Sequence, residues 1–145
     1  MRGTLVALLV LVLAGCSSSP APSPPDPAAP TSWLGMVPGD ARPFHGSGGE
    51  LILIYVDETY AIDRTNASAL TWALGEDYTT DYFEEDDDGT LWWYGRRGSW
   101  RAGKHGEEPR ELDIVDHRVT FGDRTITLSD DGPVQLETPD GVYTR

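Results

Sequence analysis

The fold is decided by the stretch RVTFGDRTITLSDDGPVQLETPDGVYTR (residues 118–145), in which turn sequences separate short segments of alternating polarity. Gly122-Asp123 stands between Arg118–Phe121 and Arg124–Leu128, and a two-residue linker of this type predicts a β-hairpin with a type II′ turn. Two further turn sequences follow. Asp130–Pro133 precedes the segment Val134–Thr138, and Thr138–Gly141 precedes the segment Val142–Arg145. Because strands joined by such short turns pair antiparallel, this stretch predicts a β-meander.

Upstream of this stretch, five further segments are predicted to be β-strands from their composition and alternation. They are Leu51–Val56, Thr59–Asp63, Ala67–Leu74, Thr79–Glu85 and Thr90–Gly95. We expect the first two to form a hairpin across Asp57-Glu58, and the last two to form one across Asp87-Asp88-Gly89. The predicted fold is all-β, an antiparallel meander over residues 32–145 that forms a small open barrel or sandwich.

The N-terminal residues have a different character. One basic residue, Arg2, precedes the apolar run Leu5–Leu13, which ends in the sequence Leu13-Ala14-Gly15-Cys16. The run is shorter than the ~20 residues of a membrane-spanning helix and is typical of a secretory signal peptide. With its cysteine, this junction resembles the lipobox of bacterial lipoproteins. The resemblance implies removal of residues 1–15, acylation of Cys16 and attachment to a membrane on the extracytoplasmic face of the bacterial cell envelope.

A plain secretory signal is the alternative, but it leaves the single cysteine of the chain as a free thiol on a secreted protein. Residues 17–31 contain six prolines. Since proline fixes φ and lacks a backbone donor, we expect an extended spacer at most ~45 Å long. The predicted organisation is a signal peptide at 1–15, the lipidated cysteine with a Pro/Ala/Ser linker at 16–31, and a β domain at 32–145. We expect Trp33–Asp40, at the start of this domain, to pack against its core.

The chain is strongly acidic, with a formal net charge of −13, and loss of Arg2 with the signal peptide lowers this by one to −14. Such a charge repels nucleic acid and anionic headgroups, so we expect no nucleic-acid partner. We expect a monomer whose partners are the membrane, through acylated Cys16, and an unidentified ligand or protein of the envelope.

Residues 76–88 hold eight carboxylates, and the order Glu84-x-Asp86-x-Asp88-Gly89 is similar to the first half of a calcium-binding EF-hand loop. The twelfth position of that loop requires a bidentate glutamate, but here it is Gly95. The match to the EF-hand loop is therefore partial, and it makes calcium candidates of Glu84, Asp86 and Asp88. The alternative is an acidic hairpin whose carboxylates are exposed to solvent. The three histidines show no metal-ligand spacing, so we expect no other metal site and no cofactor.

Large aromatic residues stand on both faces of the predicted strand that contains Trp92-Trp93-Tyr94. Leu91 and Trp93 share one face, which we expect to be the core, and Trp92 and Tyr94 share the other. Trp92 and Tyr94 are the candidate ligand-facing residues, because aromatic rings beside polar groups bind sugars and apolar ligands. The alternative is that all of these rings fill the core of a small β domain.

No catalytic residue is predicted. Ser99 stands in Gly98-Ser99-Trp100 rather than in the G-x-S-x-G pattern of a nucleophile elbow. Carboxylates in a solvated acidic run rarely keep the separation of ~5–10 Å that glycoside hydrolysis requires.

The segment that begins with Tyr82-Phe83 and continues through Asp88–Gly95, followed by Gly98–Gly103, resembles part of uncharacterised bacterial secreted β-domain proteins. Those proteins carry an Asp-Gly turn, a Trp-Tyr strand and then a Gly-Ser-Trp-x-Ala-Gly turn. The resemblance implies an all-β domain and no established activity. We therefore expect a lipid-anchored extracytoplasmic β domain with a non-catalytic binding or accessory role. The alternatives are a hydrolase of envelope glycan or peptide and a purely structural lipoprotein.

We predict that Cys16→Ala abolishes acylation and leaves the precursor unprocessed at Gly15, because the thiol is the acceptor of the lipid. Metabolic labelling with a fatty-acid probe, read together with the mass of the mature chain, measures both effects. Labelling of the Cys16→Ala chain at the level of the unaltered chain would contradict the lipobox assignment.

Overall fold

The computed structural model describes residues 33–145, and within this range it contains twelve β-strands and no helix. The strands are β1 (Ala41–Gly46), β2 (Gly49–Tyr55), β3 (Tyr60–Ile62), β4 (Thr65–Leu74), β5 (Asp77–Glu85), β6 (Leu91–Arg96), β7 (Trp100–Arg101), β8 (Arg110–Leu112), β9 (Arg118–Phe121), β10 (Arg124–Ser129), β11 (Gly132–Thr138) and β12 (Gly141–Thr144). The predicted signal peptide at 1–15, its lipobox Leu13–Cys16 and the linker at 16–31 lie outside the described residues. Over the described range, no helix has the length and hydropathy needed to span a membrane.

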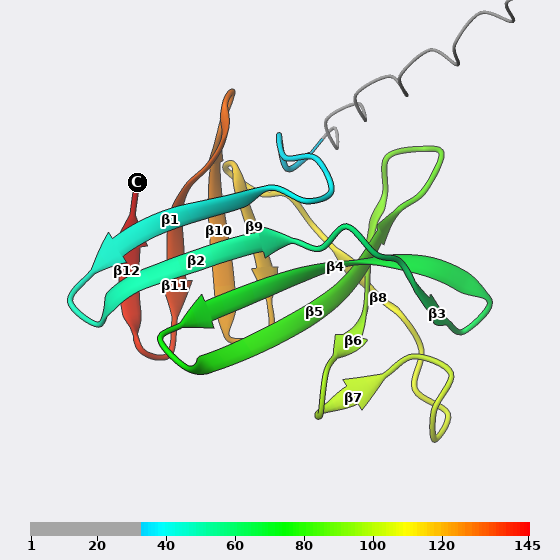
Figure 1. The fold of residues 1–145 in the computed structure, drawn as a ribbon. Helices are drawn as coiled ribbons and strands as arrows, with labels where there is room; N and C mark the ends of the chain where they lie inside the picture. The colour runs from blue at the N-terminus through cyan, green and yellow to red at the C-terminus, as the bar shows by residue number, and fades with distance from the viewer. Residues whose placement is uncertain (1–32) are drawn as a thin grey trace, which may run out of the picture.

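One antiparallel sheet accounts for the whole described domain. Ten strands follow one another across it in the order β7-β6-β5-β4-β2-β1-β12-β11-β10-β9, while β3 pairs with β4 and β8 pairs with β6 beside this path. The sheet curls on itself into a half-barrel (Figure 1). The prediction of an all-β antiparallel fold is confirmed, and of the two predicted forms the open barrel describes it.

The hairpins predicted at the C-terminal end of the chain are confirmed. The residue pairs that close their three turns are Phe121–Arg124, Ser129–Gly132 and Thr138–Gly141. After the last turn, β12 pairs with β1, and Thr144 lies opposite His45. The C-terminal strand therefore joins the hairpins of the second half of the sheet to the strands of the first half.

Of the upstream predictions, the hairpin of Thr79–Glu85 with Thr90–Gly95 is confirmed as β5 and β6. The hairpin predicted between Leu51–Val56 and Thr59–Asp63 is wrong, because β2 pairs with β1 and β4 whereas β3 pairs only with β4. The β3–β4 turn explains the difference. Its two residues, Asp63 and Arg64, both have positive φ, 42° and 71°, as a tight two-residue hairpin requires.

The main hydrophobic core fills the inside of the curl. Rings from both ends of the sheet path meet there, since the Trp93 ring of β6 lies edge-on to the Phe121 ring of β9 with 6.1 Å between centroids. The segment before β1 contributes three buried side chains to the same cluster, Trp33, Leu34 and Met36. The predicted packing of Trp33–Asp40 against the core is therefore confirmed.

A second, smaller cluster lies on the other face of β4, β5 and β6. Its buried members are Ile62, Ala67, Ala69, Tyr82 and Ala102. Tyr60, Tyr94 and Trp100 pack against it and remain partly exposed. Because side chains alternate along a strand, β4 and β5 serve both clusters at once, and aromatic residues near β7 are left at the surface.

We predict that Trp93→Ala lowers the free energy of unfolding by about 3–5 kcal/mol, because the ring is buried and its removal leaves a large cavity. Trp92→Ala is expected to cost only about 1 kcal/mol, since Trp92 is half-exposed and loses mainly one hydrogen bond, from Nε1 to Asp86. Urea denaturation of the two variants measures the difference. Losses of equal size would show that both faces of β6 are core.

Candidate functional site

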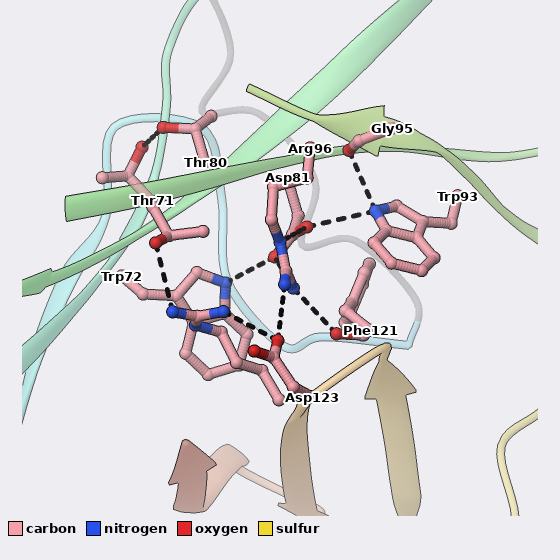
Figure 2. A network of polar contacts seen from close by, with 11 residues as sticks. Thr71, Trp72, Thr80, Asp81, Trp93, Gly95, Arg96, Phe121 and Asp123 are labelled. Atoms are coloured by element: carbon pink, nitrogen blue, oxygen red, sulfur yellow. Dashed lines mark hydrogen bonds and ion pairs between the residues drawn. The ribbon is translucent and has the colours of Figure 1, made fainter. Parts of the chain in front are cut away.

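The most unusual side chain of the domain is Asp81, a carboxylate on β5 with no exposed surface. Its two oxygens accept four hydrogen bonds, and the donors are Trp72 Nε1 at 3.0 Å, Trp93 Nε1 at 3.1 Å, Arg96 Nε at 2.9 Å and Arg96 Nη2 at 3.2 Å (Figure 2). The sequence analysis predicted that the carboxylates of residues 76–88 are exposed to solvent, and for Asp81 this prediction is wrong. A buried carboxylate is tolerated only when its acceptors are satisfied, and here they are.

Arg96 extends this cluster from β6 to the other end of the sheet. Its Nη2 donates to the Phe121 carbonyl at 2.8 Å, and its Nη1 pairs with Asp123 in the turn between β9 and β10. Asp123 also accepts from Arg124 Nη1 at 2.8 Å. The charges alternate along the row Asp81–Arg96–Asp123–Arg124, so that the row is neutral as a whole. We refer to these four residues as the Asp81 network.

The pKa values of the network follow from burial and from these contacts. Burial raises the pKa of Asp81, and the hydrogen bonds and charge of Arg96 oppose that rise. Burial also acts to raise the pKa of Asp123, but the hydrogen bond and charge of Arg96 outweigh it and leave that pKa below its usual value. Burial disfavours the charge of Arg96, yet its two carboxylate partners hold its pKa above the usual value. The guanidinium therefore stays charged and fixed between them.

An open cavity of about 560 Å³ lies beside Arg96 and is formed mainly by β7 and the loops on either side of it. Three aromatic residues line it, from β3, β5 and β7: Tyr60, Tyr82 and Trp100. Four cationic residues line it as well: Arg96, Arg97, Arg101 and Lys104. A concave surface of this size with aromatic and charged groups has the features of a ligand site. We refer to it as the β7 cavity.

Close packing behind the β7 cavity holds its aromatic side chains in place. The Tyr60 and Tyr82 ring centroids are 5.1 Å apart, and the Trp100 ring stands edge-on to the buried Trp93 ring at 4.9 Å. Gly95 allows the backbone of β7 to lie close to β6, because a Cβ atom there would lie 2.4 Å from the Trp100 carbonyl oxygen. The site is therefore supported by the core and by the Asp81 network behind it.

Cations lie over two of these rings. The guanidinium carbon of Arg101 is 5.5 Å from the centroid of the Tyr82 ring, and that of Arg110 is 4.1 Å from the centroid of the Trp100 ring. Both distances are within the range of cation–π contacts. Positive charge and aromatic faces therefore occur side by side in this part of the surface.

The structure separates the residues that the sequence predicted as ligand-facing from the β7 cavity. Trp92 donates from Nε1 to Asp86 at 3.0 Å, and Tyr94 packs against the second cluster. Burial, together with the neighbouring Glu84, raises the pKa of the Tyr94 hydroxyl. Neither residue lines the β7 cavity. Their role in ligand binding stays a prediction.

The calcium candidates belong to the turn between β5 and β6. Asp86 Oδ1 and Asp88 Oδ1 accept from the backbone N–H of Thr90 at 2.8 and 3.1 Å, and Asp88 Oδ1 also accepts from the Thr90 hydroxyl. Glu84 lies on β5 beside Tyr94. In residues 33–145, no group of three histidine, cysteine or acidic side chains is arranged to hold a metal ion.

Ser99 and His105 both line the β7 cavity, but no hydrogen bond in the described part of the chain joins either side chain to a catalytic partner. The single carboxylate of the cavity, Glu107, accepts from the backbone N–H of Arg101 at 3.3 Å. The groups that the cavity offers are therefore mostly hydrogen-bond donors and aromatic faces.

Comparisons of the chain with protein-family models, with curated proteins and with solved structures found no match. The geometry of the cavity is therefore the basis for a functional proposal. The sequence analysis did not predict this cavity, because it considered the net charge of −13 for the whole chain and not the local excess of basic residues. The signal was present in residues 96–110, which hold five basic and two acidic residues around Trp100.

We predict that Asp81→Asn lowers the free energy of unfolding by about 3–5 kcal/mol, because an amide nitrogen cannot accept from an indole or a guanidinium and leaves buried donors unpaired. The matched control is Asp77→Asn, an exposed position on the same strand, which is expected to change stability by less than about 0.5 kcal/mol. Urea denaturation gives both values. Equal small losses would mean that the network contributes nothing to the fold.

Proposed function

We propose that this chain is a lipid-anchored, non-catalytic binding protein of the bacterial cell envelope, and that its ligand binds in the β7 cavity. The observation that carries the proposal is the composition of this cavity. Among the described residues, three aromatic and four cationic ones line one open space of about 560 Å³, in a chain whose net charge is −13. Such a concentration of recognition groups against the overall charge favours a binding role over a purely structural one.

The envelope location is supported by the N-terminal sequence. The lipobox Leu13–Cys16 would provide the anchor, and the proline-rich residues 17–31 would hold the β domain away from the bilayer. A ligand of the β7 cavity would then be a component of the envelope within reach of this tether.

Binding is favoured over hydrolysis by the chemistry of the lining. A glycosidase needs two carboxylates on opposite sides of the scissile bond. The β7 cavity has one, Glu107, and its side chain already accepts from the backbone of the loop. Guanidinium groups and aromatic faces, which dominate the lining, orient a ligand without transferring a proton to or from it.

We predict that Ser99→Trp weakens binding of the full chain to envelope material by about tenfold or more, which corresponds to ~1.4 kcal/mol. Ser99 is exposed in the turn between β6 and β7 and lines the cavity, so that a large ring there fills the space whatever the ligand is. The measurement is co-sedimentation of the purified chain with envelope material from which the membrane lipids have been extracted, so that the acyl anchor does not contribute.

Ser47→Trp is the matched control, because Ser47 is an exposed serine in the turn between β1 and β2, away from the β7 cavity. It should bind as the unaltered chain does. If Ser99→Trp also binds as the unaltered chain does, the β7 cavity is not the binding site and the proposal fails.

A further inference from the structure

We infer that the β7 cavity takes an anionic saccharide, that is, a sugar ring bearing a carboxylate or a phosphate. The inference rests on the proposed function, since it names the ligand class of the same site. It is derived from two features of the cavity: cations without a carboxylate partner among residues 33–145, and aromatic side chains beside them.

Three cations of the cavity, Arg97, Arg101 and Lys104, lack a carboxylate partner within the described chain. No carboxylate of residues 33–145 lies within 4.0 Å of a nitrogen of the Arg97, Arg101 or Lys104 side chain. Arg96 is different, because the Asp81 network neutralises it. In an acidic domain with many carboxylates available, three neighbouring unpaired cations favour an anionic ligand. A guanidinium suits a carboxylate or a phosphate because it donates two parallel hydrogen bonds.

The aromatic residues add a requirement for a ring. Tyr60 and Trp100, both partly exposed, provide apolar surface against which the C–H groups of a sugar ring pack, as in apolar ligand pockets with a few polar groups. Because Arg97, Arg101 and Lys104 line the same space, a charge attached to that ring meets a cation beside an aromatic side chain. A volume of about 560 Å³ suits a ligand of one to a few sugar rings.

A nucleic acid offers anionic groups and rings as well, but it fits the rest of the molecule poorly. Its affinity depends on many phosphate contacts along an extended basic surface, and this chain has a net charge of −13. Four of the ten Lys and Arg residues in 33–145 line one cavity, where a short anionic saccharide can contact them without an extended basic surface.

The test is isothermal titration calorimetry with the full chain in detergent and four probes. Trigalacturonate carries ring and carboxylate, its methyl ester keeps the rings without the charge, glucose 6-phosphate carries ring and phosphate, and inorganic phosphate carries charge alone. We expect trigalacturonate or glucose 6-phosphate to bind, and whichever binds more tightly identifies the anionic group. The methyl ester and inorganic phosphate should each bind about tenfold more weakly or not at all, a difference of ~1.4 kcal/mol.

Variants locate the binding. Arg97→Gln and Lys104→Gln, both at exposed positions of the cavity, should each weaken the binding of the charged sugar severalfold, and Arg145→Gln, an exposed cation at the far end of the chain, should leave it unchanged. Equal affinity for the methyl ester or for inorganic phosphate would overturn the inference, as would the absence of binding by both charged sugars. In any of these cases a loss of envelope binding by Ser99→Trp would still support the proposed function, so the two failures are distinguishable.

Discussion

The structure depends on one buried carboxylate. Asp81 lies inside the half-barrel with no exposed surface, and only its contacts with two indoles and one guanidinium make that position tolerable. A curled sheet with free edges is not closed by backbone hydrogen bonds as a full barrel is. Here Arg96 reaches from Asp81 to the Phe121 carbonyl and to Asp123, so that side-chain contacts connect the two ends of the curl (Figure 2).

The same cluster supports the candidate site. The Trp93 ring donates a hydrogen bond to Asp81 and packs against the Trp100 ring. Arg96 belongs both to the Asp81 network and to the lining of the β7 cavity. The aromatic side chains of the cavity therefore rest on a rigid polar centre. The cations further out, such as Arg97 and Lys104, are exposed and have no carboxylate partner among residues 33–145, and so are available to a ligand. A rigid support with free charges in front of it is what a pre-formed binding site requires.

Much of the fold could be predicted from the sequence, because turn residues and alternation are local signals. The turn sequence Gly122-Asp123 and the two turn sequences after it predicted the three C-terminal hairpins. The alternation of side chains along the strand predicted that Trp93 is a core residue. The pairing of β3 with β4 could not be predicted. It depends on a tight turn in which Asp63 and Arg64 both have positive φ, a conformation that these residue types seldom adopt. β1 was missed because proline, glycine and exposed side chains leave Phe44 as its one buried residue.

The candidate site was harder to predict, because it is built from residues that are distant in the sequence. Tyr60, Tyr82 and Trp100 come together only when β3, β5 and β7 meet at one end of the sheet. Asp81 looked like one more member of an acidic run, and nothing local distinguishes it from its solvated neighbours. What distinguishes it is the convergence of two tryptophans and an arginine from two neighbouring strands.

The most direct test of this account is amide hydrogen exchange in the Asp81→Asn chain, compared with the unaltered chain at the same pH. Within residues 33–145, no hydrogen bond or ion pair joins Asp81 directly to β9 or β10, and Arg96 connects them. The account predicts that protection falls further in β9 and β10 than in β1 and β2, which lie in the middle of the sheet. An equal fall in both regions would contradict the claim that the Asp81 network connects the ends of the half-barrel.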